Sequence, residues 1–209
     1  MRTDGKKRSE DILDAALACF AKQGVVLTRI DDIRTQSGAS PSSIYHLFGG
    51  MDAILLALLQ RTFARLFQHL ADRVTKTRTA QGAIKMLVTA HLDWVFAHRT
   101  EARVMYQAMS LEMTEQTATR LATRKAEMLT PVVTHLARFI AQGDLPRWSP
   151  LMLDVVVLGA SHEACRRYLA GAALDAQWMR RTLPALSWRS LTGATRPLAR
   201  RRPAKRKPH

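Results

Sequence analysis

Apolar residues near the start of the chain recur at the spacing of one helical face. They are Ile12, Leu13, Ala16, Leu17 and Phe20, and the pattern stops at Gly24. Residues three and four positions apart lie on the same side of an α-helix, so this stretch predicts an amphipathic helix over residues 9–23.

A second, shorter pattern follows. Ile30 and Ile33 supply a small apolar face, and the pattern breaks at Gly38. Thr28 precedes Asp31 by three positions, the spacing at which a hydroxyl caps a helix and an acid supports it. We therefore expect a short second helix that Thr28 caps.

A third helix is predicted directly after the break. Ser40 can cap it, and Pro41 then takes the first helical position, where a missing N–H costs nothing. Ile44 and Phe48 would turn inward, which leaves Ser42, Ser43, Tyr45 and His46 for solvent or DNA. Two short helices joined by a turn that contains glycine, and braced by a preceding helix, meet the physical description of a helix-turn-helix.

The rest of the chain keeps a helical period. A helix of about twenty residues begins at Met51, and further helices are expected over residues 80–97, 101–110, 115–142, 150–170 and 175–191, with Pro131 kinking or splitting the longest. No stretch alternates like a strand. The prediction is an all-α protein with a DNA-binding head over residues 1–50, a helical ligand and dimerisation domain over 51–192, and a disordered basic tail over 193–209.

Charge changes this picture in one respect. Lysine and arginine outnumber aspartate and glutamate 32 to 17, which favours a polyanionic partner. The excess is uneven, because residues 196–207 hold seven basic residues and no acid, whereas residues 1–50 hold seven basic and six acidic ones. The head is therefore not itself a polycation, and whether the tail contacts DNA stays open.

Other classes of protein receive little support. No apolar run follows the N-terminal residues, and no apolar stretch approaches the roughly 20 residues that span a bilayer, so we expect a cytoplasmic protein without a membrane partner. Cys19 and Cys165 stand singly on helical patterns and suggest reduced core residues. No metal and no cofactor are expected.

The first 55 residues hold an ordered set of short segments, which are Ile12-Leu13-Asp14-Ala15-Ala16, Phe20-Ala21, Gly24, Thr28, Ile30, Ile33, Ser37-Gly38-Ala39-Ser40, Ile44-Tyr45-His46-Leu47-Phe48 and Ala53-Ile54-Leu55. In their order and spacing these segments resemble the tetracycline-repressor-like (TetR) family of transcriptional regulators. The resemblance implies about nine helices, a double-stranded DNA operator as partner, and a homodimer formed through the last two helices.

The resemblance also implies individual DNA contacts. Thr28 would grip a phosphate, and Tyr45 and His46 would bond to the DNA backbone. The full set of expected contacts is Thr28, Arg29, Ser40, Ser42, Ser43, Tyr45 and His46. Each residue also has a purely structural interpretation, since threonine and serine cap helices without DNA and Tyr45 could be a core aromatic.

Two departures from the family pattern stand out. Gly50-Met51-Asp52 replaces the usual Ser-Lys-Glu, which removes a hydroxyl cap and a phosphate-binding lysine. The third helix also has no lysine or arginine, so bidentate guanine recognition from it is not available. Specificity would then depend on serine contacts, Arg29, Arg34, thymine methyl groups or DNA shape.

The second half offers a candidate pocket for a small apolar or amphipathic ligand and a candidate dimer interface. Methionine and aromatic side chains adapt to irregular ligands, although the same residues are ordinary core. The pocket candidates are His91, Trp94, Met105, Tyr106, Met109, Met128 and His135. The interface candidates are Ser161, Ala164, Cys165, Tyr168, Trp178 and Leu183.

Three functions compete. The leading one is a repressor that binds a palindromic operator as a dimer and is released by a small molecule. The second keeps the fold but binds nucleic acid without sequence preference through the tail. The third is a thiol-dependent enzyme that uses Cys165, His162 and Asp154, which is disfavoured because Asp154 lies two helical turns from His162 and no compact triad forms.

Overall fold

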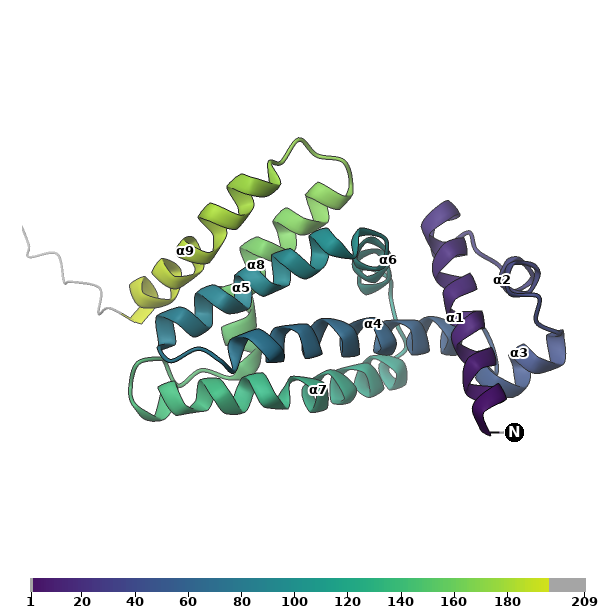
Figure 1. Cartoon of the computed structure of the whole chain (residues 1–209), viewed down its shortest axis with the longest axis horizontal. Coiled ribbons are helices and arrows are strands. Elements are labelled where there is room, and N and C mark those ends of the chain that lie inside the picture. Colours follow the sequence, from purple (N-terminus) through teal and green to yellow (C-terminus); the bar gives the residue numbers. More distant parts are fainter. Residues whose placement is uncertain (1, 196–209) are drawn as a thin grey trace, which may run out of the picture.

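The computed structural model describes residues 2–195, and every regular element in that range is a helix (Figure 1). The helices are α1 Arg2–Gln23, α2 Ile30–Ser37, α3 Pro41–Phe48, α4 Met51–Val74, α5 Ala80–Ala97, α6 Arg99–Met109, α7 Glu115–Ala141, α8 Pro150–Leu169 and α9 Ala176–Thr195. The predicted all-α architecture of about nine helices is confirmed.

Helices α1, α2 and α3 form a small unit at one end of the molecule, and α4 runs from it into the larger bundle of α5 to α9 (Figure 1). Two boundaries differ from the sequence prediction. Helix α1 begins at Arg2 rather than at Ser9, and α9 continues to Thr195, so three residues assigned to the tail are helical. Both extensions lack apolar periodicity, which was the signal used to place the ends. Residues 196–209 of the predicted tail lie outside the described residues.

Helix α7 is continuous through Pro131, so the expected split does not occur. Proline removes one backbone hydrogen bond and crowds the preceding turn. Packing outweighs this cost, because Val132, Leu136 and Phe139 are buried on the side of α7 that faces the bundle, while Pro131 itself is exposed.

The head has its own apolar core. Side chains from α1, α2, α3 and the first turns of α4 meet there, and one side chain comes from α6. Its buried members are Ile12, Leu13, Ala15, Ala16, Cys19, Phe20, Ile33, Ala39, Ile44, Ile54, Leu58 and Val104. The head is therefore joined to the rest of the chain by packing as well as by α4.

The second core lies among α4 to α9, with Trp94, Ile84, Leu92 and Met179 among its fully buried side chains. Within residues 2–195 no single helix is long and apolar enough to cross a membrane. Helices α3 and α4 reach the required length and apolarity only as a pair, and they are bent by 62° at the break between them.

Candidate functional site

The N-terminus of α2 is capped differently from the sequence prediction. Arg29, in an extended conformation, is the N-cap residue, and its backbone N–H donates to Asp32 Oδ2 at 2.8 Å. That hydrogen bond, with a second from Gln23, lowers the pKa of the Asp32 carboxyl. Thr28 does not cap the helix, because its hydroxyl donates to the Gly24 carbonyl at 2.7 Å and its side chain is buried. A contact from this hydroxyl to a phosphate remains a prediction.

The turn between α2 and α3 follows the prediction. Gly38 ends α2 with a φ of 64°, a left-handed conformation that a Cβ would strain. Ser40 is the N-cap of α3, where its Oγ accepts from the Ser43 N–H at 3.2 Å, and Pro41 occupies the first helical turn. The Ser40 hydroxyl also lies 3.0 Å from Ser42 Oγ and 2.8 Å from Ser43 Oγ. Three hydroxyls therefore cluster at the start of α3.

Helix α3 is two-sided. Ile44 is 1% exposed and fixes the helix on the head core, whereas Tyr45 is 57% exposed and His46 is exposed beside it. Ser42 is exposed as well. Tyr45 is therefore not a core aromatic, and α3 presents a polar face with hydroxyl and imidazole groups. A face of this kind offers hydrogen bonds to a phosphate backbone or to base edges.

The junction with α4 confirms the lost cap. Gly49, at a φ of 80°, ends α3, and Gly50 precedes α4 without a side-chain hydrogen bond. Met51 packs against the head core. The position that would hold a lysine in related sequences is thus apolar and half-buried.

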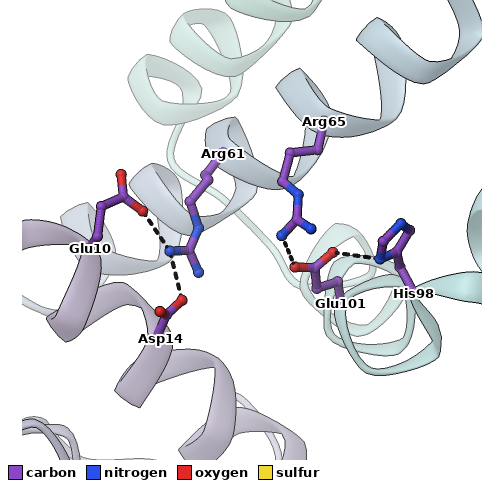
Figure 2. Close-up of polar contacts among 6 residues, drawn as sticks. All are labelled: Glu10, Asp14, Arg61, Arg65, His98 and Glu101. Carbon is purple, nitrogen blue, oxygen red and sulfur yellow. Dashed lines mark hydrogen bonds and ion pairs between the residues drawn. The ribbon is translucent and has the colours of Figure 1, made fainter.

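Two arginines on one side of α4 form ion pairs with its neighbours (Figure 2). Arg61 Nη1 lies 2.8 Å from both Glu10 and Asp14 of α1. One turn further along, Arg65 pairs with Glu101 of α6, whose other carboxylate oxygen lies 3.7 Å from His98 Nδ1. Helix α4 thus forms ion pairs with the head through Arg61 and with α6 through Arg65, one turn later.

Helix α6 is in contact with both cores. Val104 is 2% exposed and belongs to the head core, and Arg103 donates to the Ala21 carbonyl of α1 at 3.4 Å. Met105 and Ala108 are buried in the other core. A shift of α6 would therefore change its packing against α1.

A chain of polar contacts crosses the second core. The Tyr106 hydroxyl of α6 lies 3.0 Å from His91 Nε2 of α5 and 3.0 Å from His162 Nδ1 of α8. The buried Cys165 thiol of α8 is near enough to Tyr106 that each group affects the pKa of the other. We call His91, Tyr106, His162 and Cys165 the polar relay. His91 is 1% exposed, and its second ring nitrogen, Nδ1, has no hydrogen-bond partner within the described residues.

Burial favours the uncharged forms of His91, Tyr106 and Cys165. Desolvation, and then the neighbouring His162, lower the pKa of His91 to about 3. Burial raises the pKa of the Tyr106 phenol, and it raises the pKa of the Cys165 thiol to about 12. A thiol with this pKa stays protonated, whereas a cysteine nucleophile acts as the thiolate.

The geometry of the suggested triad is partly different from expectation. Asp154 Oδ1 does come within 3.9 Å of His162 Nε2, so the expectation that two helical turns keep these side chains apart is wrong. Both side chains are long enough to reach along α8. Burial raises the pKa of the Cys165 thiol, however, which gives no support to thiol chemistry.

The other pocket candidates are dispersed. Met105 is buried and Met128 half-buried in the second core, while Met109 is 42% exposed. His135 lies apart from the relay, where its Nε2 is 3.0 Å from the hydroxyl of Thr77 between α4 and α5. Of the predicted set, the structure joins only His91 and Tyr106 by a hydrogen bond.

Two cavities lie elsewhere in the bundle. One of about 540 Å³ is lined by Ala64, Arg65, Gln68, His69, Asp72, Trp94 and His98. The other, of about 400 Å³, is lined by Thr75, Lys76, Thr77, Arg78, Arg138, Phe139 and Gln142. Trp94 is the one pocket candidate among these lining residues.

The interface candidates divide by burial. Ser161, Cys165 and Leu183 are 0–3% exposed and face the core of their own subunit. Ala164 and Tyr168 are half-buried, and Trp178 is 44% exposed. The large apolar side chains that α8 and α9 do expose are Leu151, Met152, Val155, Trp178 and Leu186.

Sequence reasoning missed the partners that come from distant segments. The sequence suggests His162 only as a partner of Cys165 and Asp154, and it gives no signal for Arg61 or Arg103. Their contacts join residues that are far apart in the chain: Arg61 lies 51 positions from Glu10, and Tyr106 lies 56 positions from His162. Helical periodicity carries no signal for such pairs, although His162 stands on the same helix face as Cys165.

Comparison with known proteins finds a family match in the head. Residues 12–58 match the model of the bacterial regulatory proteins of the tetR family. The chain is 26% identical over 86 residues to the HTH-type transcriptional regulator BetI of Brucella anthropi, covering 41% of this chain and 44% of that protein. It is 23% identical over 111 residues to the HTH-type transcriptional regulator YuxN of Bacillus subtilis, covering 53% and 38%. The matched segment thus spans less than half of each relative.

Solved structures match over nearly the whole fold. The regulator FadR of Bacillus subtilis, in complex with stearoyl-CoA, gives a TM-score of 0.69 at 15% identity, covering 88% of this chain and 98% of that one. A TetR-family regulator from Syntrophomonas wolfei gives a TM-score of 0.75 at 15% identity, covering 90% and 96%. At these identities the likeness concerns the fold.

Proposed function

We propose that the chain, whose residues 12–58 match the tetR family of bacterial regulatory proteins, is a transcriptional repressor that binds a palindromic DNA operator as a homodimer and releases it when a small molecule binds. Two-fold symmetry of the dimer would place the two heads on half-sites about 34–36 Å apart, or at a nearby distance.

The observation that carries the proposal is the two-sided α3. Ile44 holds this helix on the head, and the exposed Tyr45, His46 and Ser42 project from the same short element. The N-terminus of α3, with its hydroxyl cluster, is the part that would face the DNA, since recognition helices contact base edges through their first residues. The phosphate contact of Thr28 and the role of Arg29 belong to the same proposal.

Selection of bound fragments from random double-stranded DNA, with the full chain, tests the proposal. We expect an enriched sequence with two-fold symmetry. Tyr45→Ala should weaken binding to it at least ten-fold, because a hydrogen bond to a charged phosphate is removed. Gln81→Ala, which changes an exposed residue of α5 in the other domain, is the matched control and should leave binding unchanged. A selected sequence without symmetry would contradict the proposed operator.

The dimer requires an apolar surface, and α8 and α9 supply one. The two helices pack on each other, with Ser187 Oγ of α9 donating to the Val157 carbonyl of α8 at 2.7 Å. Leu151 and Val155, one turn apart on α8, are 71% and 63% exposed, and Trp178 of α9 is 44% exposed. An exposed apolar patch of this kind is typical of an interface between subunits.

Sedimentation of a matched pair of variants tests this interface. Val155→Asp should shift the chain toward monomer, since an unpaired charge would be buried at the contact. Val133→Asp, at a position of α7 that is 38% exposed, introduces the same charge away from α8 and α9 and should leave the dimer intact. Equal behaviour of the two variants would place the interface elsewhere.

Coupling between ligand and DNA would pass through α6. Tyr106 belongs to the polar relay, whereas Val104, two residues earlier, belongs to the head core. A ligand that binds one position of α6 better than the other would change the position of α1 and so the spacing of the heads. FadR of Bacillus subtilis, whose structure contains stearoyl-CoA, supports a small-molecule site in a bundle of this fold.

A second mode of DNA binding is favoured by the charge distribution. Residues 196–207 carry seven basic side chains without an acid. Removing residues 196–209 should reduce non-specific binding and flatten the dependence of log K on salt concentration, while the selected operator is still bound. Loss of all binding would instead favour a sequence-indifferent nucleic-acid binder.

A further inference from the structure

The relay contains an unusual atom, the unpartnered Nδ1 of His91. The side chain is 1% exposed, and Nδ1 is buried without a hydrogen-bond partner in the described residues. A buried polar atom without a partner has lost its hydrogen bonds to water without replacing them, so most such atoms in folded proteins have a partner. His91 Nδ1 thus has a hydrogen bond to gain from a molecule that enters this core.

The hydrogen-bonding group that this molecule needs follows from where the protons of the polar relay lie. The Asp154 carboxylate lies 3.9 Å from His162 Nε2 and favours the tautomer with its proton there. His162 Nδ1 then accepts from the Tyr106 hydroxyl, which lies 3.0 Å away. A tyrosine hydroxyl has only one proton, so its oxygen must accept from His91 Nε2–H, also at 3.0 Å.

This order leaves His91 Nδ1 with a lone pair and no proton. An incoming group must therefore donate a hydrogen bond to His91. It must also be uncharged, since an ion placed beside His91, which is 1% exposed, would lose its hydration.

We infer that His91 Nδ1 is the recognition point for the effector, and that the effector is a neutral, largely apolar molecule with one hydrogen-bond donor, such as an alcohol. The inference rests on the proposed function only in calling this molecule an effector. Its binding at His91 can be tested without DNA. Neither cavity described above has a relay residue in its lining. The bound conformation therefore involves displacement of side chains around α6, which links binding to the helix that contacts the head.

Three probes of equal chain length separate the possibilities: 1-octanol donates a hydrogen bond, octyl methyl ether only accepts, and octanoate is charged. The thermal unfolding midpoint of the full chain is measured against each, without DNA. We expect 1-octanol to raise the midpoint at concentrations about ten-fold lower than the other two, because one hydrogen bond is worth roughly that factor in affinity. Equal action of alcohol and ether, or no action of the alcohol, would overturn the inference.

His91→Gln is the informative variant. Its amide can still reach Tyr106 in place of Nε2, but nothing replaces Nδ1. The preference for alcohol over ether should fall from about ten-fold to none. Tyr168→Phe is the matched control, because it removes a hydroxyl of α8 that bonds to Arg99 outside the relay, and it should keep the preference. A preference that survives in His91→Gln would overturn the inference.

If His91→Gln does not fold, nitrogen NMR of the unaltered protein decides. The resonance of an unprotonated His91 Nδ1 should be present in the free protein and move when 1-octanol is added. A protonated Nδ1 would contradict the inference. The proposed function is judged separately by DNA release: a chain that binds the alcohol but no operator refutes the function alone, and one that binds the operator but ignores the alcohol refutes the inference alone.

Discussion

The two cores of the molecule differ in where they keep their polar groups. In the head, hydroxyls and carboxylates lie at helix ends, as at Ser40 and Asp32, and the buried core is apolar apart from Thr28. In the second core a histidine is fully buried, and Tyr106 bonds to it and to another histidine across three helices. The head is thus built to hold one shape, whereas the second core contains polar groups whose partners can change.

This difference fits the proposed function, in which the head recognises a fixed surface and the second core responds to a ligand. Capping bonds join residues three or four positions apart, so they form with the helix and add rigidity. Hydrogen bonds in a buried relay depend on helices that are distant in sequence, and they are costly to leave unsatisfied. A ligand that changes them can therefore shift the packing of α5, α6 and α8.

The largest expected effect comes from the apolar core of the head. Phe20→Ala should lower the free energy of unfolding by about 3–5 kcal/mol, because a large side chain that is 1% exposed leaves a cavity. Chemical denaturation measures this loss. Leu27→Ala, at a side chain that is 72% exposed in the same head, should change the stability by less than about 0.5 kcal/mol. A small effect of Phe20→Ala would show that the head core is loosely packed.

A pH profile should separate the second core from the head. Burial lowers the pKa of His91 to about 3, whereas the unfolded chain takes up this proton near pH 6.5. The unfolded state therefore binds more protons between these values, and stability falls as the pH decreases from about 6.5 toward 3. We expect His91 to account for about 3 kcal/mol of lost stability between pH 7 and pH 4.

The contribution of His91 is read as a difference between two profiles. Other histidines and the carboxylates titrate in both the unaltered chain and His91→Gln, so subtracting their denaturation profiles isolates this group. The variant should lose less stability on acidification. Parallel profiles would mean that water or a neighbouring group allows His91 to be protonated in the folded state.

The fold was largely predictable because its signals are local. Apolar periodicity located the helices, and Gly38, Ser40 and Pro41 placed the turn and the third helix at the right residues. The N-cap of α2 was assigned to Thr28 because a hydroxyl at that spacing usually caps. In the structure that hydroxyl donates to the Gly24 carbonyl instead, and the carboxylate of Asp32, in the first turn of α2, accepts from the backbone N–H of the N-cap residue Arg29.

The candidate sites were predictable only in part. The exposed face of α3 follows from its period, because Ile44 must be buried and its neighbours then are not. The pairing of Tyr106 with His162, and the burial of Ser161 and Cys165 within the chain, depend on how α5, α6 and α8 pack together. Side-chain type alone cannot distinguish an interface residue from a core residue on helices that are apolar on more than one side.

A smaller effect should distinguish structure from recognition within the head. Ser40→Ala removes the cap of α3 and should cost about 1 kcal/mol of stability. Ser42→Ala removes an exposed hydroxyl that caps nothing and should leave the stability within about 0.5 kcal/mol. Denaturation together with operator binding checks both. If Ser42→Ala weakens binding while the fold is unchanged, its hydroxyl contacts DNA; equal losses of stability in the two variants would contradict the assigned cap.

The smallest effect on stability concerns the contact between the two regions. Arg61 pairs with Glu10 and Asp14, but these carboxylates are 49% and 71% exposed, so solvent and salt weaken the attraction. Arg61→Gln should lower the free energy of unfolding by less than about 1 kcal/mol, and by still less at high salt. Because this arginine fixes α1 against α4, its loss should change operator affinity more than stability. Arg124→Gln, which breaks the ion pair with Glu127 within α7, is the control and should alter neither binding nor its response to a ligand. If the two variants behave alike, the orientation of the head depends on the packing of Val104 rather than on charge.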